Sequence, residues 1–478
     1  MRKTLRLLLG PALIGSILAA PLGAAAGHQR PYVHVAGIQE AGGGLEVVGH
    51  SPLNNRGMNA ALAVHGDYAY VGSRTDAKAG NANGAGVLVV DVSKPEAPEV
   101  VHEIGPPDEA NPGETSREMR IWHEQELLIV MTLFSNCGEI HACSPIEGQD
   151  RFNFYDISGK NAAAPKLVAT YEPSENPHEF FLWEDPKDQG RALLFISNPG
   201  GGAQLTVTDI SQARKGKFTE LLKMSPLYNG GNLHSLGISA DGKRGYLAHL
   251  AGGVGVIDTS LVTKGAKKPA IKVLTLAANA AQWPGPGPHS AVKIPGQDYM
   301  LITDEVYGAA LKALGGHGCP WGWMRAVDIG NEAKPKVVSE YKLPQNEESV
   351  CPPQDAIHPT TSFAAHNPTL TRNIAFITWH SGGLQAVDIS DPAKPAQLAE
   401  FVATPVVPIL QEDPILSSGG DKVVAWSYPI IQDGLIYFVD VRNGLYVMRY
   451  KGPYEKEVAA VDFIEGNSNQ GDALKLDK

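Results

Sequence analysis

Several patterns that commonly reveal a protein's function are missing from this sequence. The chain of 478 residues has a formal net charge of −11 and no run rich in lysine or arginine, whereas binding to nucleic-acid phosphates requires a basic face. It has no G-x-S-x-G, P-loop, HExxH or EF-hand pattern, so serine hydrolase, nucleotide-binding and calcium-loop functions lack support. No apolar segment after residue 26 is long enough to span a bilayer. We therefore expect neither a nucleic-acid partner nor a membrane span.

Cysteine is also scarce, with only Cys137, Cys143, Cys319 and Cys351. An even number of cysteines in an oxidising compartment suggests two disulfides. Cys137–Cys143 would close a local loop, and Cys319–Cys351 would join two loops that flank one repeat, although four cysteines allow three pairings. The alternative, a zinc site of four cysteines, lacks the usual C-x2-C spacing. We expect disulfides.

The first 26 residues predict export. They combine a basic start, "MRKTLR", with the apolar stretch "LLLGPALIGSILAAPLG" and the small residues Ala24, Ala25 and Ala26, which is the design of a secretory signal peptide. A membrane anchor is the alternative, but glycine and proline interrupt this stretch and small residues end it. We expect cleavage after residue 26, with the mature protein secreted, periplasmic or on the cell surface.

Glycine (52 residues) and proline (35) are abundant and spread along the chain, which favours many short strands joined by turns over long helices. Strands that end in aspartate recur at intervals from 49 residues (Asp209 to Asp258) to 70 residues (Asp258 to Asp328). The copies are "GVLVVDVS" (Asp91), "RFNFYDIS" (Asp156), "QLTVTDIS" (Asp209), "GVGVIDTS" (Asp258), "WMRAVDIG" (Asp328), "GLQAVDIS" (Asp388) and "GLYVMRYK", with Arg449 in place of the aspartate. We interpret these aspartates as structural, because such a carboxylate accepts N–H groups of the following turn.

Two further alternating strands precede each copy, so that each unit has about four strands. Seven such units predict an all-β, seven-bladed β-propeller around a central channel. The early strand 45–51 could complete the last blade and so close the ring. The expected organisation is a signal peptide (1–26), a lead-in (27–44), the propeller (45–453) and a C-terminal tail (454–478).

The motif "VLVVDVS…P" and its relatives resemble the LVIVD-repeat proteins, which are bacterial extracellular propellers. The resemblance extends from about residue 45 to 450. It implies the propeller fold and is weak for function, because the family is linked mostly to surface or binding roles. This chain departs from the pattern at Arg449 and in insertions of the second and fifth repeats, which contain the cysteines.

Histidines recur at one position of the predicted blades. The inner strands of blades three to six begin at His178, His234, His289 and His366, whereas Met58, a residue near Ser116–Arg117, and Trp426 take this position in blades one, two and seven. In antiparallel blades the end of the second strand lies beside the start of the first. That position is occupied by Asn198 in blade three, His249 in blade four, Asp304 and Glu305 in blade five, and His380 in blade six.

Neutral imidazoles that converge on one point are typical ligands of a divalent transition metal: iron, copper, manganese or zinc. We expect His178, His234, His289 and His366 to be the ligands, with Glu179 or Asp304 as outer partners that orient the rings. This quartet resembles the four-histidine iron centre of carotenoid-cleaving oxygenases, and it is similar to the histidine-rich channel of methanethiol oxidases of the selenium-binding-protein type. The repeats do not match those families, so their substrates are not implied. The alternative is that each histidine only hydrogen-bonds a loop of the next blade.

Two functions of different classes follow. The first is a metal-dependent enzyme, an oxidoreductase or else a lyase or hydrolase, with a small-molecule substrate and with Glu305, His249 or His380 as catalytic base. Arg117, Glu118 and Arg120 could hold an anionic substrate at the channel or pair with one another. The second is a non-catalytic extracellular scaffold that binds a protein or glycan, because propellers serve both purposes.

Overall fold

The computed structural model describes residues 44–74, 86–104, 114–136, 144–145, 150–199, 201–224, 231–284, 287–305, 322–350, 363–412, 423–466, 468 and 471–478. These residues belong to one compact unit, Val35–Lys478. The predicted signal peptide, almost all of the lead-in and the four cysteines, with their predicted disulfides, lie outside the described residues.

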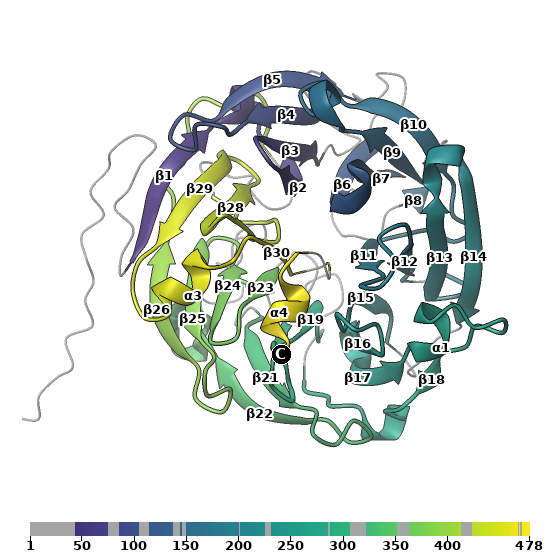
Figure 1. Ribbon diagram of the computed structural model, residues 1–478. Helices are drawn as coiled ribbons and strands as arrows, with labels where there is room; N and C mark the ends of the chain where they lie inside the picture. Colours follow the sequence, from purple (N-terminus) through teal and green to yellow (C-terminus); the bar gives the residue numbers. More distant parts are fainter. Residues whose placement is uncertain are drawn as a thin grey trace, which may run out of the picture. The chain divides into compact units, whose positions relative to one another are not determined.

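Seven antiparallel sheets are arranged in a ring, which confirms the predicted seven-bladed β-propeller (Figure 1). Blade 1 contains β2 (Asn59–His65), β3 (Tyr68–Ser73), β4 (Val87–Asp91) and β5 (Glu99–Ile104). Blade 2 contains β6 (Glu114–Trp122), β7 (Leu127–Asn136), β9 (Arg151–Asp156) and β10 (Lys166–Tyr171), and β8 (Ser144–Pro145) pairs with β7. Blade 3 contains β11 (Glu179–Glu184), β12 (Ala192–Ser197), β13 (Leu205–Gln212) and β14 (Lys217–Met224).

The remaining blades repeat this arrangement. Blade 4 contains β15 (Leu233–Ile238), β16 (Arg244–His249), β17 (Gly253–Asp258) and β18 (Lys272–Val273). The short helix α1 (Ser260–Thr263) connects β17 with β18. Blade 5 contains β19 (Ser290–Lys293), β20 (Tyr299–Thr303), β21 (Met324–Asp328) and β22 (Lys336–Tyr341). Blade 6 contains β23 (Pro368–Leu370), β24 (Ile374–Thr378), β25 (Leu384–Asp388) and β26 (Ala396–Phe401). Blade 7 contains β27 (Ile430–Gln432), β28 (Leu435–Asp440), β29 (Gly444–Tyr450) and β1 (Leu45–Ser51).

Aspartates of the third strands in five blades have the predicted structural role, and four of them end their strand. Each carboxylate accepts the backbone N–H group two residues further along, at 2.8–2.9 Å. These aspartates are Asp91, Asp209, Asp258, Asp328 and Asp388. The repeated sequence signal therefore reflects a turn that leads from the third strand to the outer strand of a blade.

The two ends of the ring are joined within blade 7. β1 pairs antiparallel with β29, with Leu45 opposite Tyr450 and Ser51 opposite Leu445. This pairing confirms the predicted closure, which covers the outer edge of β29 with a strand from the beginning of the ring. Apolar side chains such as Phe181, Trp183 and Leu236 fill the space between adjacent blades.

The chain after Tyr450 returns to the centre of the ring. It forms α3 (Glu455–Ala459), β30 (Phe463–Glu465) and α4 (Ala473–Leu476). β30 pairs with the inner strand β27, and Figure 1 shows β30 and α4 over the middle of the ring. We call residues 452–478 the C-terminal segment. The sequence predicted only a tail here, because the segment has no counterpart in the other repeats.

The C-terminal segment contacts several other blades, among them blade 3 through a parallel bridge between Ser468 and Leu182. Glu465 pairs with Arg120 of β6 at 3.1 Å, and Asp477 pairs with Lys293 of β19 at 2.6 Å. The Gly466 N–H group donates to Thr369 Oγ1 of β23. No helix among the described residues has the length and apolar character needed to cross a membrane.

Candidate metal centre

The inner strands begin at one end of the ring, and irregular backbone there directs side chains into the channel. In blade 4, Leu233 pairs with His249 and Ser235 with Ala248, so that His234 is the extra residue of a β-bulge. A bulge re-aims one side chain away from the regular alternation of a strand. In blade 2 the register shifts in the same way between Ser116 and Glu118, which leaves Arg117 in the corresponding position.

The four predicted histidines form a continuous arc across blades 3 to 6. The ring centroids of His178 and His234 are 4.4 Å apart, those of His234 and His289 are 4.1 Å apart, and those of His289 and His366 are 4.4 Å apart. His380 continues the arc, 5.0 Å from His366. The structure thus brings together five of the six histidines that the sequence singled out.

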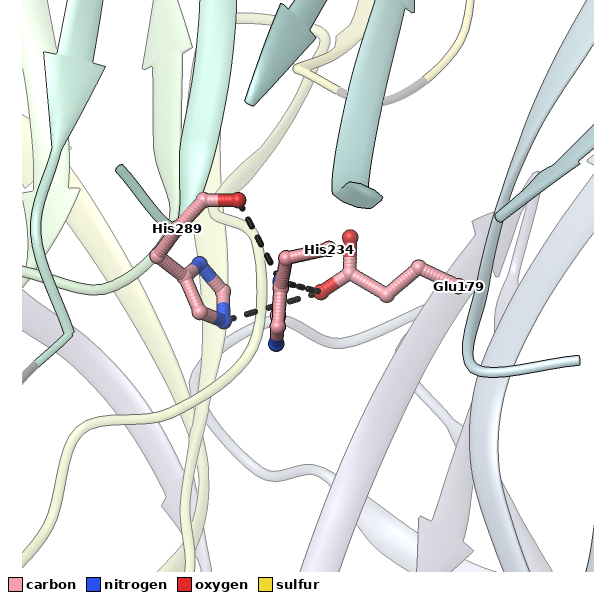
Figure 2. A group of neighbouring side chains, drawn as sticks. All are labelled: Glu179, His234 and His289. Atoms are coloured by element: carbon pink, nitrogen blue, oxygen red, sulfur yellow. Dashed lines mark hydrogen bonds and ion pairs between the residues drawn. The ribbon is translucent and has the colours of Figure 1, made fainter. Parts of the chain in front are cut away.

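Two glutamates lie within this arc. Glu179 Oε1 is 3.9 Å from His234 Nδ1 and 3.7 Å from His289 Nε2, as Figure 2 shows. Glu305 places Oε2 3.5 Å from His289 Nε2 and Oε1 3.5 Å from His366 Nε2. We use the name histidine cluster for His178, His234, His289, His366, Glu179 and Glu305.

The cluster contains two overlapping sets of ligand atoms. Glu179, His234 and His289 form one set, His289, Glu305 and His366 form the other, and within each set the ligand atoms lie within 4.8 Å of one another. His178 Nε2 is 2.8 Å from His234 Nε2, a hydrogen-bond distance that links His178 to the first set. Either set could hold a metal ion.

The partners of the outer ring nitrogens orient the imidazoles toward the channel. His366 Nδ1 lies 2.7 Å from the Trp426 carbonyl oxygen, and His234 Nδ1 lies 3.3 Å from that of His289. A carbonyl oxygen only accepts hydrogen bonds, so these Nδ1 atoms carry the hydrogen and Nε2 carries the lone pair. His289 Nδ1 contacts Ser290 Oγ at 2.8 Å. Such outer partners are typical of metal-binding histidines.

Burial keeps the imidazoles neutral. Desolvation lowers the pKa of His234 to about 4 and that of His366 to about 3. The pKa of His178 lies well below its usual value because of burial first, and then because of the neighbouring His234, Arg117 and Arg74. All three rings are therefore uncharged near pH 7, as metal ligands need to be.

The carboxyl group of Glu179 shows the opposite shift. Burial raises its pKa well above the usual value, and the charge of Glu118 adds to this effect. Burial therefore favours the protonated form of Glu179 when no cation is bound. A bound divalent ion would supply the positive charge that the ionised carboxylate lacks.

His380 contacts the cluster through Glu305. Its Nε2 lies 3.1 Å from Glu305 Oε1, and its side chain is fully buried. The backbone of His380 has φ = 36°, in the left-handed region that few residues other than glycine adopt. Its ring also stacks on Trp426 with centroids 5.5 Å apart. His380 thus holds one oxygen of Glu305 while the other faces His289.

Three other residues, which the sequence analysis placed at the ends of second strands beside the histidines, bind neighbouring parts of their own blades. Asp304 accepts hydrogen bonds from Trp283 Nε1, at 2.9 Å, and from Arg325, so it pairs with an arginine of its own blade instead of orienting a cluster histidine. Asn198 donates to Ala203 O and Thr206 Oγ1, both at 3.0 Å. His249 ends β16, is fully buried and hydrogen-bonds the backbone of Gly231.

The sequence analysis expected Glu179 as an outer partner that orients a ring, whereas in the structure its carboxylate lies among the histidine nitrogens, in one of the two ligand sets. A regular strand puts neighbouring residues on opposite faces. His178 precedes β11, where the backbone is not yet a regular strand. Both side chains consequently reach the same histidine, His234.

Comparisons with known proteins agree with this fold. The LVIVD repeat model matches residues 56–104 and 370–404. No curated protein matches the chain. Among solved structures, Chaetomium thermophilum Raptor has a TM-score of 0.50 at 12% identity, over 86% of this chain and 30% of that one.

Two other solved structures have lower TM-scores. Chaetomium thermophilum Sqt1, bound to the N-terminus of ribosomal protein L10, has a TM-score of 0.45 at 14% identity, over 85% of this chain and 90% of that one. The β-propeller domain of Myceliophteria thermophila Cps50 (Swd1) has a TM-score of 0.46 at 8% identity, over 83% and 97%. The repeat match and the seven four-stranded blades agree: the chain is a seven-bladed β-propeller that contains LVIVD repeats.

Proposed function

We propose that the histidine cluster binds one divalent transition metal ion and that the protein is an exported metal-dependent enzyme. The observation that carries the proposal is the pair of overlapping ligand sets, which share His289 and combine imidazole nitrogens with two carboxylates. Because His289 Nε2 faces both Glu179 and Glu305, one ion beside this atom would meet ligands of both sets. The predicted signal peptide supports export.

The ligand atoms of the cluster limit which metal ions are expected to bind. Imidazole suits zinc, copper, iron and nickel, whereas carboxylate suits harder ions such as manganese. A mixed set of imidazoles and carboxylates without a thiolate therefore favours iron, manganese or zinc over Cu(I). With iron or copper bound, such a site supports oxidation of a small molecule, so an oxidoreductase is the first class to assay.

Burial of the cluster favours a small substrate over a macromolecular one. His234 is 6% exposed, and His289 and His366 are each 2% exposed. A protein or glycan bound to the outside of the ring would not reach these rings. Where the ion lies in the set of Glu179, His234 and His289, Glu305, held by His380 at 3.1 Å, is the candidate general base.

The test is elemental analysis of the mature protein, purified without a chelator and without a polyhistidine tag, beside the double variant His234→Ala/His289→Ala. We expect about one equivalent of iron, manganese, copper or zinc in the unchanged protein and less than a tenth of that in the variant. The matched control is His65→Ala/His102→Ala, which removes two histidines of blade 1 that belong to neither ligand set.

Circular dichroism shows whether each variant is folded. Metal in the unchanged protein and in the control, and its loss from a folded cluster variant, would support the proposal. Absence of metal from the unchanged protein, even after reconstitution with each ion, would contradict it. The propeller would then be an extracellular scaffold for a protein or glycan partner.

A further inference from the structure

The outer ring nitrogen of His289 has a different kind of partner from those of its neighbours in the arc. His234 Nδ1 lies 3.3 Å from the carbonyl oxygen of His289 (Figure 2), and His366 Nδ1 lies 2.7 Å from that of Trp426. His289 Nδ1 lies 2.8 Å from the hydroxyl oxygen of Ser290 instead. A carbonyl oxygen only accepts hydrogen bonds, whereas a hydroxyl group donates or accepts. The contact with Ser290 alone therefore does not decide which nitrogen of His289 carries the hydrogen.

The position of this hydrogen decides whether His289 can bind a metal ion. His289 belongs to both ligand sets, and its Nε2 faces Glu179 at 3.7 Å and Glu305 at 3.5 Å. A nitrogen binds a metal ion through its lone pair, so a hydrogen on Nε2 would block this atom. Both carboxylate distances exceed the usual hydrogen-bond length of about 2.7–3.2 Å. The shorter contact of Nδ1 with Ser290 is therefore the stronger influence on the ring.

Asn367 determines the direction in which the Ser290 hydroxyl group donates. Asn367 Nδ2 donates to the Trp426 carbonyl oxygen at 3.0 Å, and Asn367 Oδ1 lies 3.4 Å from Ser290 Oγ. The opposite orientation of the amide would place two oxygens without a hydrogen against each other. Asn367 is 1% exposed, and a buried acceptor without a donor is unfavourable. Ser290 therefore donates its single hydrogen to Asn367 and accepts one from His289 Nδ1.

Tyr428 fits the same arrangement. Its hydroxyl oxygen lies 3.2 Å from Ser290 Oγ, and both residues are buried. The Ser290 oxygen has two lone pairs. One accepts the hydrogen of His289 Nδ1, and the other accepts the hydroxyl hydrogen of Tyr428. Each of the three contacts around Ser290 Oγ then has one donor and one acceptor.

We propose that Asn367 is a positioning residue of the metal centre, which fixes the hydrogen of His289 on Nδ1 through Ser290 and so leaves the Nε2 lone pair to the ion. This proposal rests on the proposed function. The Trp426 carbonyl oxygen that accepts from Asn367 also accepts from His366 Nδ1. One amide side chain thus connects the outer nitrogens of His289 and His366, the two imidazoles of the second ligand set. Outer partners of this kind orient metal-binding rings before the ion binds.

The first experiment measures the hydrogen position in the mature protein, freed of metal and labelled with nitrogen-15 in its histidines. Correlation spectra between the ring protons and the ring nitrogens distinguish a nitrogen that carries a hydrogen from one that does not. The signal of His289 is assigned by its loss from His289→Gln. At neutral pH we expect the hydrogen on Nδ1 in the unchanged protein. In Asn367→Ala it should shift toward Nε2, because Ser290 is then free to donate to Nδ1.

The second experiment measures the affinity for Zn²⁺ by competition with a coloured chelator. Asn367→Ala should weaken Zn²⁺ binding about 10- to 100-fold, the usual cost of removing an outer partner of a metal-binding histidine. The matched control is Asn153→Ala in blade 2. Asn153 is also buried, and its Oδ1 accepts a hydrogen bond from Thr170 at 3.0 Å. This control should change neither the hydrogen position of His289 nor the affinity for Zn²⁺.

Ser290→Ala tests the route by which Asn367 acts. Without the hydroxyl group, the hydrogen of His289 should move toward Nε2, where Glu179 and Glu305 can accept it. The double variant Ser290→Ala/Asn367→Ala should show the same hydrogen position as Ser290→Ala, because effects that pass through one shared group do not add. A further shift in the double variant would contradict the proposed route.

The outcomes separate this proposal from the proposed function. If the unchanged protein binds no Zn²⁺ or other ion, the proposed function fails. If it binds Zn²⁺ but carries the hydrogen on Nε2 of the metal-free His289, or keeps it on Nδ1 in a folded Asn367→Ala, only the role of Asn367 is overturned. An equal loss of affinity in Asn153→Ala would also overturn that role. Should Asn367→Ala not fold, a hydrogen that stays on Nδ1 in Ser290→Ala would overturn it.

Discussion

At the scale of single residues, burial keeps the cluster histidines neutral, the form that a metal ligand needs. An ordinary imidazole has a pKa near 6.5 and would be partly charged at mildly acidic pH. In this protein the pKa of His234 falls to about 4 and that of His366 to about 3, because burial disfavours the charged form. Their lone pairs stay available well below neutral pH.

The first prediction concerns the number of protons released when the metal binds. At pH 5.5, His178, His234 and His366 are already neutral, whereas Glu179 holds a proton because burial raises its pKa. Binding of Zn²⁺ should therefore release about one proton, from Glu179. Isothermal titration calorimetry in two buffers of different ionisation enthalpy measures this number.

Histidines with unshifted pKa values would release more protons when the metal binds. With a pKa near 6.5, each of the three rings would be about nine-tenths protonated at pH 5.5, and binding would release more than two further protons. The control is Glu179→Gln, which should release about one proton fewer than the unchanged protein. Release of three or more protons by the unchanged protein at pH 5.5 would contradict the pKa shifts on which the prediction depends.

The positions of the four inner histidines were predictable from the sequence because they repeat from blade to blade. His178, His234, His289 and His366 occupy equivalent positions of four blades, so alignment of the repeats was enough to predict them. The roles of Glu179 and Asp304 were not predictable in this way. They depend on where the strand begins beside His178 and on Arg325, which lies across the blade from Asp304.

At the scale of elements, the C-terminal segment is the part that the repeat pattern did not reveal. β30 has only three residues, "FIE", and no copy elsewhere in the chain. Its position on β27 depends on buried partners that are remote in sequence. Phe463 and Ile464 are 9% and 6% exposed, and Glu465 pairs with the buried Arg120. Such contacts leave no local signature in a single sequence.

The second prediction is that β30 stabilises the ring. A chain that ends at Val461 loses the burial of Phe463 and Ile464, each worth about 1.5–3 kcal/mol, and leaves Arg120 without Glu465. We expect the free energy of unfolding to fall by about 3 kcal/mol or more. Urea unfolding measured by tryptophan fluorescence tests this, provided that both chains unfold in one transition.

A chain that ends at Gly466 is the control for this truncation. It keeps β30 and removes α4 with the partly exposed pair of Lys293 and Asp477. Exposed ion pairs contribute about 0–1 kcal/mol, so this chain should lose only on the order of 1 kcal/mol. Equal losses in the two chains would show that α4, and not β30, fixes the C-terminal segment.

At the scale of the whole molecule, the repeats determine the number of blades, and one strand determines whether they form a closed ring. Six aspartates and the aspartate-free copy at Arg449 predicted seven blades, because each copy marks a third strand. The match of only two segments, 56–104 and 370–404, to the repeat model shows how far the other copies have diverged. Closure was predictable because β1 precedes the first blade and has no partner within it.

The last prediction concerns this closure. Gly49 of β1 lies where a Cβ atom would be 2.0 Å from Pro95 O and 3.0 Å from Pro98 Cδ, so that β1 packs against the turn of blade 1 only with glycine at this position. Gly49→Ala should push β1 away from the seam between blades 7 and 1, at a cost of about 1–3 kcal/mol. The lower temperature of thermal unfolding measures this cost.

Gly202→Ala is the matched control, because its Cβ atom would be 3.8 Å from Glu175 Oε2, an ordinary contact. It should leave the unfolding temperature unchanged. A ring opened at β1 exposes the edge of β29, and an exposed edge strand pairs with other chains. Gly49→Ala should therefore also elute earlier on size exclusion at high concentration. If Gly49→Ala unfolds at the same temperature as Gly202→Ala, the prediction is wrong. β1 can then shift to make room for the Cβ atom without a loss of stability.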